Sequence, residues 1–352
     1  MYASESELLG RKRIAVGVPL LVLGLSFLMT IPGASACIVG CSGEGAYSGR
    51  AFGAWVSVPG VINQYFADTG DLPPEGGAIY ATPETVNTPA AQAEVLVSWT
   101  MGVNSVAQSE AATGDVVLLA GTELEVRADF VRAWTVATCD GVSGGSEITG
   151  LTVGGQAVVV TGDTNQYVIN TATVVLLLNE QGTNTADGCN AITVNAIHLW
   201  VAGGTEVIVS SAHSDITCPV GPSGGGGEET PHDFVTGGGW ITPYGAKANF
   251  GFVAGYKPHK TEVSGNLNYI DHNDGMHVKS EEIQTYEITG EHRRTFTGTA
   301  SVDGVSGYTF SCTVEDNAEP GHGVDWYELH VFENGYDASG YLGGGNIQLH
   351  PW

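Results

Sequence analysis

Short runs rich in Val, Ile, Thr and aromatic residues recur along most of the chain, about ten residues apart, with Gly, Asn and Asp between them. This pattern constrains the fold more than any other feature of the sequence. In one run, Val95, Val97 and Trp99 alternate with other residues and are expected to share one face of a strand. Val174–Leu178 is continuously apolar, which is typical of a strand buried on both sides. The sequence therefore predicts an all-β fold of antiparallel sandwiches or barrels.

Two further stretches predict local structure. A strand is expected over Thr122–Thr138, because β-forming residues dominate it. Its residues Leu124, Val126 and Ala128 alternate and should share a face. Helical spacing is scarce, and Pro89–Gln92 is the stretch that indicates a single helical turn.

The N-terminal segment has the three parts of a secretory signal peptide. The basic residues Arg11–Arg13 precede an apolar run, Ile14–Ile31, and the small residues Ala34–Ala36 follow it. We therefore expect residues 1–36 to be a signal peptide, so that the mature protein acts outside the cytoplasm at the cell surface or in the medium. The alternative is that this segment is a transmembrane anchor. The mature chain beyond it is expected to contain no transmembrane helix.

A segment rich in Gly and Pro divides the mature chain. Residues 219–230 contain Pro219, Pro222 and four consecutive glycines, and nothing in them is suited to burial. They are predicted to be a flexible linker between a β domain over 37–218 and a C-terminal β domain over 231–352. Gly237–Gly239, near the start of the second domain, would suit a sheet corner or a close backbone contact.

The chain is strongly acidic, with 38 Asp and Glu against 12 Lys and Arg and a formal net charge of −26. Binding to nucleic acid or to anionic lipid needs a cluster of basic residues, and the sequence contains none, so neither is an expected partner. We interpret the charge as a solvated acidic surface. The alternative is an adaptation to divalent cations or to a salty habitat.

The cysteines of an exported chain are able to form disulfides. The six residues are Cys37, Cys41, Cys139, Cys189, Cys218 and Cys312. Five of them precede the linker, and an odd number cannot all pair with one another. If Cys37 were the lipid-modified first residue of a lipoprotein, the next four would form two bridges with three connectivities. Ordinary cleavage after Ala36 is the preferred prediction, because a larger aliphatic residue usually stands where Ala34 does. Cys312 alternates with apolar residues and is predicted to be a buried free thiol.

Two stretches fit the G-x-S-x-G pattern of serine hydrolases, around Ser143 and Ser223. That chemistry needs the serine on a strained turn between a strand and a helix, with Asp and His later in the chain. Ser223 lies in the linker, and Ser143 is predicted in a Gly-rich turn with no helix after it. We therefore assign no catalytic residue and no cofactor-binding residue, and the protein is not expected to be an enzyme.

An acidic cluster around Asp271, Asn273 and Asp274 has the oxygen ligands that Ca²⁺ prefers. His272 and His277 are the residue types that bind transition metals. However, Asn-Asp-Gly is also an ordinary hairpin turn, and the spacing does not match an EF-hand loop. The turn is the preferred interpretation, with Ca²⁺ as the alternative and no other cofactor expected.

Several aromatic side chains in the second domain could form a platform for sugar rings. The residues concerned are Trp240, Tyr244, Tyr256 and Tyr269. Packing in the core explains them equally well. His198 is predicted to be a structural histidine bonded within the sheet. Glu180 follows a buried strand, where polar side chains close turns, and the sequence offers no partner carboxylate that would make it a catalytic acid.

Two strings, Leu178–Gln181 (LNEQ) and Val194–His198 (VNAIH), carry a resemblance to a known family. Together with their surroundings over residues 45–215, they resemble the choice-of-anchor P family of bacterial surface proteins. The stretch that begins DFVTGGGWI and ends GGGNIQLH looks like the domain that often follows that family's core. The resemblance implies an exported protein without an established enzymatic activity. Members of the family use different C-terminal anchors, and none is recognised before Trp352.

We therefore expect a secreted or cell-surface, non-catalytic protein of the structural or adhesion type in the cell envelope. Its expected partners are envelope or extracellular components, including polysaccharide or like subunits. The main alternative is a carbohydrate-binding or Ca²⁺-dependent adhesin. An extracellular hydrolase and a subunit of an extracellular filament are the remaining alternatives.

Overall fold

The computed structural model describes residues 46–185, 189–218, 233–258 and 260–351. These residues form 23 β-strands and no helix, which confirms the all-β prediction. Among them, no helix has the length and apolar character that a membrane span needs. The signal peptide over residues 1–36, Cys37, Cys41 and the linker over 219–230 lie outside the described residues, so these assignments stay predictions. All described residues belong to one compact unit.

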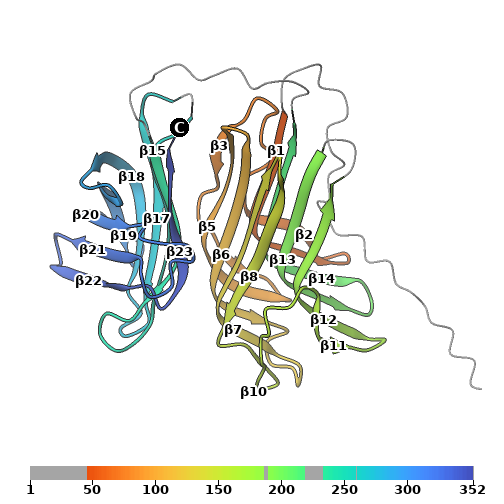
Figure 1. Cartoon of the computed structure of the whole chain (residues 1–352). Helices are drawn as coiled ribbons and strands as arrows, with labels where there is room; N and C mark the ends of the chain where they lie inside the picture. The colour runs from red at the N-terminus through yellow and green to blue at the C-terminus, as the bar shows by residue number, and fades with distance from the viewer. Residues whose placement is uncertain (1–45, 186–188, 219–232, 259, 352) are drawn as a thin grey trace, which may run out of the picture. The chain divides into compact units, whose positions relative to one another are not determined.

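The strands form three sheets, which we call A, B and C (Figure 1). Sheet A contains, in order, β11 (Gln166–Asn170), β12 (Val174–Asn184), β13 (Cys189–Val201), β14 (Thr205–Thr217), β1 (Ala46–Val58) and β2 (Ile62–Asp68). Sheet B contains β10 (Gln156–Ala157), β9 (Thr152–Val153), β7 (Val126–Thr138), β6 (Val106–Leu118), β5 (Ala91–Val103) and β3 (Gly77–Tyr80), with β8 (Gly141–Thr149) beside β7 and β4 (Thr85–Asn87) beside β5. All pairings in both sheets are antiparallel.

Sheet C is formed by the C-terminal part of the chain. Its order is β22 (Tyr336–Tyr341), β21 (Trp326–Val331), β20 (Val305–Glu315), β19 (Arg293–Val302), β18 (His277–Ile288), β17 (Val263–Asp271), β16 (Ala248–Tyr256), β15 (Asp233–Ile241) and β23 (Gly344–Pro351). Strands β15 to β22 follow one another as an antiparallel meander. The last strand, β23, returns to pair with β15 at the opposite edge.

Sheets A and B pack face to face around an apolar core, as in a β-sandwich. The continuous run Val174–Leu178 lies at the start of β12, and its residues Leu176 and Leu178 are fully buried in that core. Val126 and Ala128 on β7 also point into it, as predicted. Leu124 does not, because it lies in the turn before β7 and is 39% exposed.

A row of irregular residues crosses sheet A and changes which side chains face the core. On β12, β14 and β2, the residues Asn179, Ser210 and Ala67 have positive φ. The pairing skips each of them, for example from Leu178↔Ile197 to Glu180↔Asn195. One residue is skipped on each of the two paired strands, so the register is unchanged while the alternation of side chains shifts by one residue. Side chains beyond the row therefore point to the opposite face from the one that strict alternation predicts.

In sheet B, an irregularity of another kind on β5 corrects the prediction for Val95, Val97 and Trp99. The register of β5 against β6 shifts between Val95 and Val97. As a result, Val95 faces the core shared with sheet A, whereas Val97 and Trp99 face sheet C. The predicted helical turn at Pro89–Gln92 is also wrong, since β5 already begins at Ala91.

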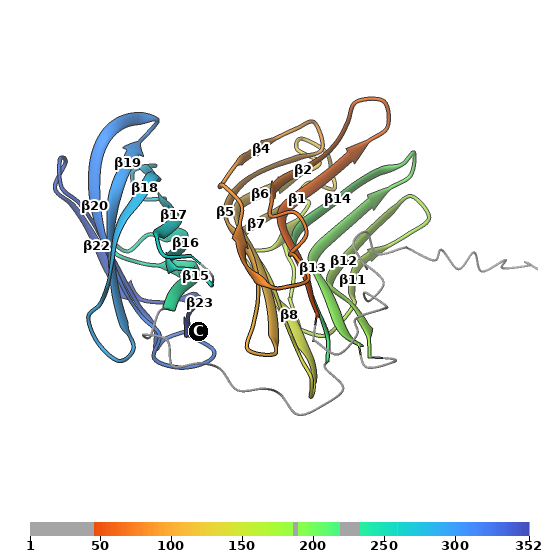
Figure 2. The ribbon, with the colours of Figure 1, turned by 90° about the horizontal axis from the view of Figure 1, so that it is seen from above.

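Sheet C curls around a core of its own, as Figure 2 shows. Phe250 on β16 stacks on Tyr327 on β21 with a centroid distance of 4.0 Å, although four strands separate them in the sheet. Neighbouring strands lie about 4.8 Å apart, so a flat sheet would hold these rings roughly 24 Å apart. The aromatic contacts therefore show that the sheet bends into a half-barrel.

Sheet B is covered on its second face by strands β15 to β17 of sheet C. Asn266 and Asn268 on β17 donate side-chain hydrogen bonds of 2.8 and 2.9 Å to backbone carbonyls of Ala81 and Val95. Gly251 on β16 faces β5 so closely that an added Cβ would lie 2.6 Å from the Leu96 carbonyl carbon. Gly239 on β15 makes a close backbone contact, since an added Cβ would lie 2.5 Å from the Gly344 carbonyl oxygen, and this agrees with one of the two roles predicted for the glycines at 237–239.

The cysteines form one bridge between described residues. Cys139, just after β7, is bonded to Cys218, just after β14, so the bridge joins sheets B and A. Of the three predicted connectivities, this bridge is compatible only with the one that pairs Cys41 with Cys189. Cys189 is also disulfide-bonded. Cys312 is a fully buried free thiol, as predicted.

Candidate functional site

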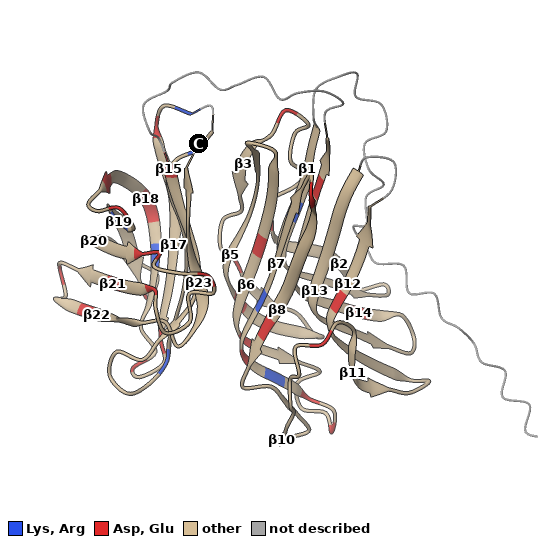
Figure 3. Ribbon diagram, in the orientation of Figure 1, with Lys and Arg blue, Asp and Glu red and all other residues tan. Residues whose placement is uncertain are grey.

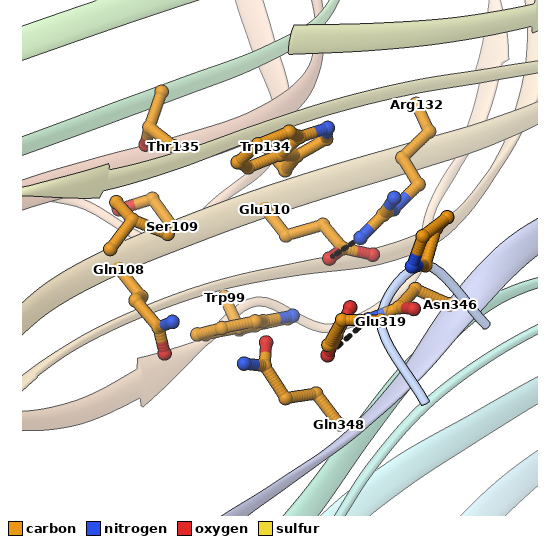
Figure 4. A pocket seen from close by; sticks show the side chains of 12 residues that line it. Trp99, Gln108, Ser109, Glu110, Arg132, Trp134, Thr135, Glu319, Asn346 and Gln348 are labelled. Carbon is orange, nitrogen blue, oxygen red and sulfur yellow. Dashed lines mark hydrogen bonds and ion pairs between the residues drawn. The ribbon is translucent and has the colours of Figure 1, made fainter. Parts of the chain in front are cut away.

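A pocket lies on the face of sheet B that is turned toward sheet C. It has a volume of about 490 Å³, within the range usual for small-molecule sites. Its floor is a row of directly opposed residues, Trp99 on β5, Glu110 on β6 and Trp134 on β7. We call it the Trp99–Trp134 pocket (Figure 4).

The two indole rings differ in how far they are exposed. Trp99 is almost fully buried and packs edge-on against His350 with a centroid distance of 4.9 Å. Trp134 is half-buried and lies opposite Gly145 on β8. Because Gly145 has no side chain, the Trp134 ring lies against backbone on that side and keeps an open edge toward the pocket. Trp134 is therefore the more accessible of the two rings.

Arg132 stands beside this row and is paired with Glu110. Its Nη2 donates to Glu110 Oε2 over 2.7 Å, and both side chains are at least 90% buried. Burial lowers the pKa of Arg132, but the charge of Glu110 and the hydrogen bond to it raise the pKa above its ordinary value. Glu110 thus takes part in a buried ion pair at the centre of the floor.

The opposite wall belongs to the loop before β21 and to β23. Glu319 Oε1 accepts a hydrogen bond of 3.0 Å from Asn346 Nδ2. Burial raises the pKa of Glu319, and this hydrogen bond partly offsets the rise. Pro320 and Gln348 complete this wall. Figure 4 shows the Glu319 carboxylate on the same side of the pocket as the nitrogen of the Trp99 ring.

Several polar groups of the pocket have no partner in the part of the chain that the structure describes. Trp99 Nε1, Glu110 Oε1 and Arg132 Nε are buried and make no hydrogen bond there. Buried polar atoms are nearly always paired in proteins, with protein groups or with water, so these three atoms can bond water or a ligand. The side-chain amides of Gln108 and Gln348 line the pocket and are also available.

This arrangement is suited to a polar ligand that also has an apolar face. Indole rings stack on flat apolar surfaces, while amides, carboxylates and an indole N–H exchange hydrogen bonds with hydroxyl or amine groups. All floor residues are on paired strands, so the pocket is formed before a ligand arrives.

The predicted sugar platform of Trp240, Tyr244 and Tyr256 is not assembled. Trp240 lies at one end of β15, opposite Asn249, and Lys247 covers its ring at 4.7 Å. Tyr256 lies on β16 seven residues beyond Asn249, which is roughly 23 Å from Asn249 at the usual rise per residue. Tyr244 is 56% exposed in the turn after β15 and packs against Tyr336. These three side chains therefore lie apart and do not form one surface.

The predicted Ca²⁺ candidates form the turn between β17 and β18. Asp271 accepts hydrogen bonds from the Asn273 N–H at 2.8 Å and from the Tyr336 hydroxyl at 2.6 Å. Asp274 accepts one from the Met276 N–H at 3.0 Å. Among the described residues, no group of three His, Cys, Asp or Glu side chains is arranged to hold a metal ion. The contacts are those of the hairpin-turn interpretation.

His198 lies on the outer face of sheet A between two carboxylates. Its Nδ1 is 2.9 Å from Glu180 Oε2 and its Nε2 is 2.8 Å from Glu206 Oε1. Burial alone would lower the pKa of His198, but the hydrogen bonds to both glutamates raise it to about 9. Glu180 also accepts a hydrogen bond from Asn195 Nδ2 at 2.7 Å. The side chain therefore has the contacts of a structural histidine.

Ser143 lies within β8, not in the predicted turn. The β8 strand pairs with β7 and places Gly145 and Glu147 opposite the pocket residues Trp134 and Arg132. No described helix follows it, so the G-x-S-x-G pattern there lacks the structural context that a hydrolase needs.

No known protein family, curated protein or solved structure matches the chain. The function must therefore be inferred from the residues of the site.

Proposed function

We propose that the protein is an exported, non-catalytic adhesion-type protein of the cell envelope that binds carbohydrate in the Trp99–Trp134 pocket. The observation that carries this proposal is the row of two indoles at the pocket floor, together with the unpaired buried atoms Trp99 Nε1, Glu110 Oε1 and Arg132 Nε. A sugar ring offers C–H groups to an indole face and hydroxyls to the polar groups around it. The predicted signal peptide over residues 1–36 and the resemblance to the choice-of-anchor P family favour an extracellular place of action.

The location of the pocket also supports a binding role. Its floor comes from sheet B and its wall from the C-terminal sheet, so the two halves of the chain contribute to one site. Glu110 is held by Arg132 over 2.7 Å, which fixes its position and commits one of its oxygens. A pre-formed site with fixed polar groups lowers the cost of ordering side chains when a ligand binds.

The experiment is a glycan-array screen of the purified mature protein, followed by titration of each hit. Trp134→Ala removes the accessible ring and should weaken binding by about tenfold or more. Trp55→Ala is the matched control, because Trp55 is also half-buried but lies on β1 of sheet A and bonds Asn63. Equal binding by wild type and the Trp134 variant, or no binding to any glycan, would refute the proposal.

An extracellular glycosidase is the second candidate, because Glu110 and Glu319 both line the pocket and burial raises the pKa of Glu319. Release of reducing ends from a bound oligosaccharide would establish it, provided that Glu319→Gln abolishes the release. We expect no release, since Glu110 is engaged with Arg132.

A further inference from the structure

The pocket has more negative than positive charge. Arg132 is the one basic side chain among the described residues that line it. Three carboxylates act on Arg132 electrostatically, those of Glu110, Glu147 and Glu319. Two of these acids, Glu110 and Glu319, line the pocket with this one cation, and a ligand that fills the pocket without a charge would displace the water that solvates the excess negative charge.

The position of Glu110 also favours a positively charged ligand. It stands directly between Trp99 and Trp134 in the cross-strand row, where opposed residues have Cβ atoms about 5 Å apart. Its Oε2 is bonded to Arg132, whereas its Oε1 has no partner. A carboxylate flanked by two indoles is an arrangement that attracts cations, because the ring faces and the free oxygen both favour positive charge.

Glu319 offers a second acceptor on the facing wall. Its Oε1 is occupied by Asn346 Nδ2, and its other oxygen has no hydrogen bond in the described structure. An anionic ligand would meet this carboxylate and Glu110 together, which disfavours acidic sugars. A protonated amine has three N–H donors and matches the acceptors that the pocket leaves open.

We propose that the sugar bound in the Trp99–Trp134 pocket is an amino sugar with a free, protonated amine, held by Glu110 and Glu319 beside the two indoles. This inference rests on the proposed function, since it names the class of carbohydrate that the same pocket selects.

The test compares two oligosaccharides of equal length, one of β-linked glucosamine and one of its N-acetylated form, by isothermal titration at about pH 6. The two differ at the nitrogen, which is charged in the first and a neutral amide in the second. Wild type should bind the amine form at least about tenfold more tightly, and raising the salt concentration should narrow the difference.

Glu319→Gln removes one acceptor charge and should weaken binding of the amine form by about threefold to tenfold, with little change for the acetylated form. Glu291→Gln is the matched control, because its side chain is 90% exposed and does not line the pocket. Thermal melting of each variant checks that it is folded.

The outcomes separate this inference from the proposed function. Equal or tighter binding of the acetylated form, or an unchanged affinity of the Glu319 variant for the amine form, overturns the amino-sugar inference and leaves carbohydrate binding in place. If neither form binds while another glycan does so through Trp134, the inference is again overturned alone. If no glycan binds, both are refuted.

Discussion

Replacement of His198 by Gln is expected to destabilise the protein by an amount that depends on pH. The imidazole lies between Glu180 and Glu206 with no exposed side-chain surface. Its pKa rises from the ordinary 6.5 to about 9 in the folded protein, because the hydrogen bonds to the two glutamates outweigh the effect of burial. Between about pH 6.5 and about pH 9, the folded protein therefore keeps a proton on His198 that the unfolded chain has released.

The sign and the size follow from this difference. A pKa that is raised on folding contributes stability that is fully present below about pH 6.5 and is lost as the pH rises through about 9. The difference of (9 − 6.5) pKa units corresponds to about 3 kcal/mol. His198→Gln should therefore cost about 3 kcal/mol more at about pH 5.5 than at about pH 9.5.

The assay is urea unfolding, followed by tryptophan fluorescence, of wild type and variant at both pH values. The comparison between the two proteins is essential, because other groups also titrate in this range. Burial lowers the pKa of Lys257 to about 7, for example, and this makes stability rise with pH between about 7 and the ordinary 10.5. That contribution is common to wild type and variant and cancels in the difference.

His350→Gln provides a control of opposite sign. Burial lowers the pKa of His350 to about 3, so folding excludes its proton and its contribution grows as the pH rises to about 6.5. This variant should cost about 1 kcal/mol more at about pH 9.5 than at about pH 5.5. If the cost of His198→Gln is the same at both pH values, the imidazole is not a cation in the folded protein and the reasoning fails.

Three further predictions concern packing, the disulfide and calcium. Gly251→Ala should lower the free energy of unfolding in urea by about 1–3 kcal/mol, because the new Cβ would meet the backbone of β5. Gly340→Ala is the control and should be neutral, since the nearest atom to an added Cβ there is 3.6 Å away. Equal stabilities of the two variants would contradict the close approach of β16 to β5. Replacing Cys139 and Cys218 by Ser should lower stability by about 4 kcal/mol, as the bridge spans 79 residues, and an unchanged urea midpoint would refute this. Millimolar Ca²⁺ should leave the melting temperature unchanged, because the carboxylates of the turn at 271–276 are already bonded within the turn and to a tyrosine. An increase in the melting temperature would support the calcium alternative.

The sequence predicted the class of fold well, because period-two patterns and apolar runs report directly on strands. The run Val174–Leu178 became the buried start of β12, and Cys312 became a buried thiol. What the pattern did not contain was the position of the bulges. Strict alternation placed Trp99 on the same face as Val95, whereas one register shift on β5 turns it toward sheet C.

The pocket could not be found from the sequence for a related reason. Its floor residue Glu110 and its wall residue Glu319 are more than two hundred positions apart, and no local motif links them. Strand β8 was also missed, because its glycines indicated a turn. The usable signal was the alternation around Trp134 on β7, which places Arg132, Trp134 and Val136 on one face of a strand.

The acidic composition now has a structural explanation besides solubility. Figure 3 shows acidic residues distributed over all three sheets, with few basic ones. Many of the carboxylates accept hydrogen bonds from backbone N–H groups. Examples are Ala67 to Glu84, His277 to Asp303 and Thr309 to Glu333. The interpretation of the charge as a solvated surface was therefore incomplete.

This use of carboxylates bears on the filament alternative. Strand β23 is an edge of sheet C, and an exposed edge invites pairing with a strand from a second copy of the chain. Alternate N–H groups of β23 point away from β15, and each is occupied. The pairs are Gly345 to Glu147, Ile347 to Asp325 and Leu349 to Asp316. A strand from another subunit would have to displace three charge-assisted hydrogen bonds before it could pair here, and one of them also joins β23 to sheet B. Growth by strand addition at this edge is thus disfavoured by the same acidic residues that the composition displays.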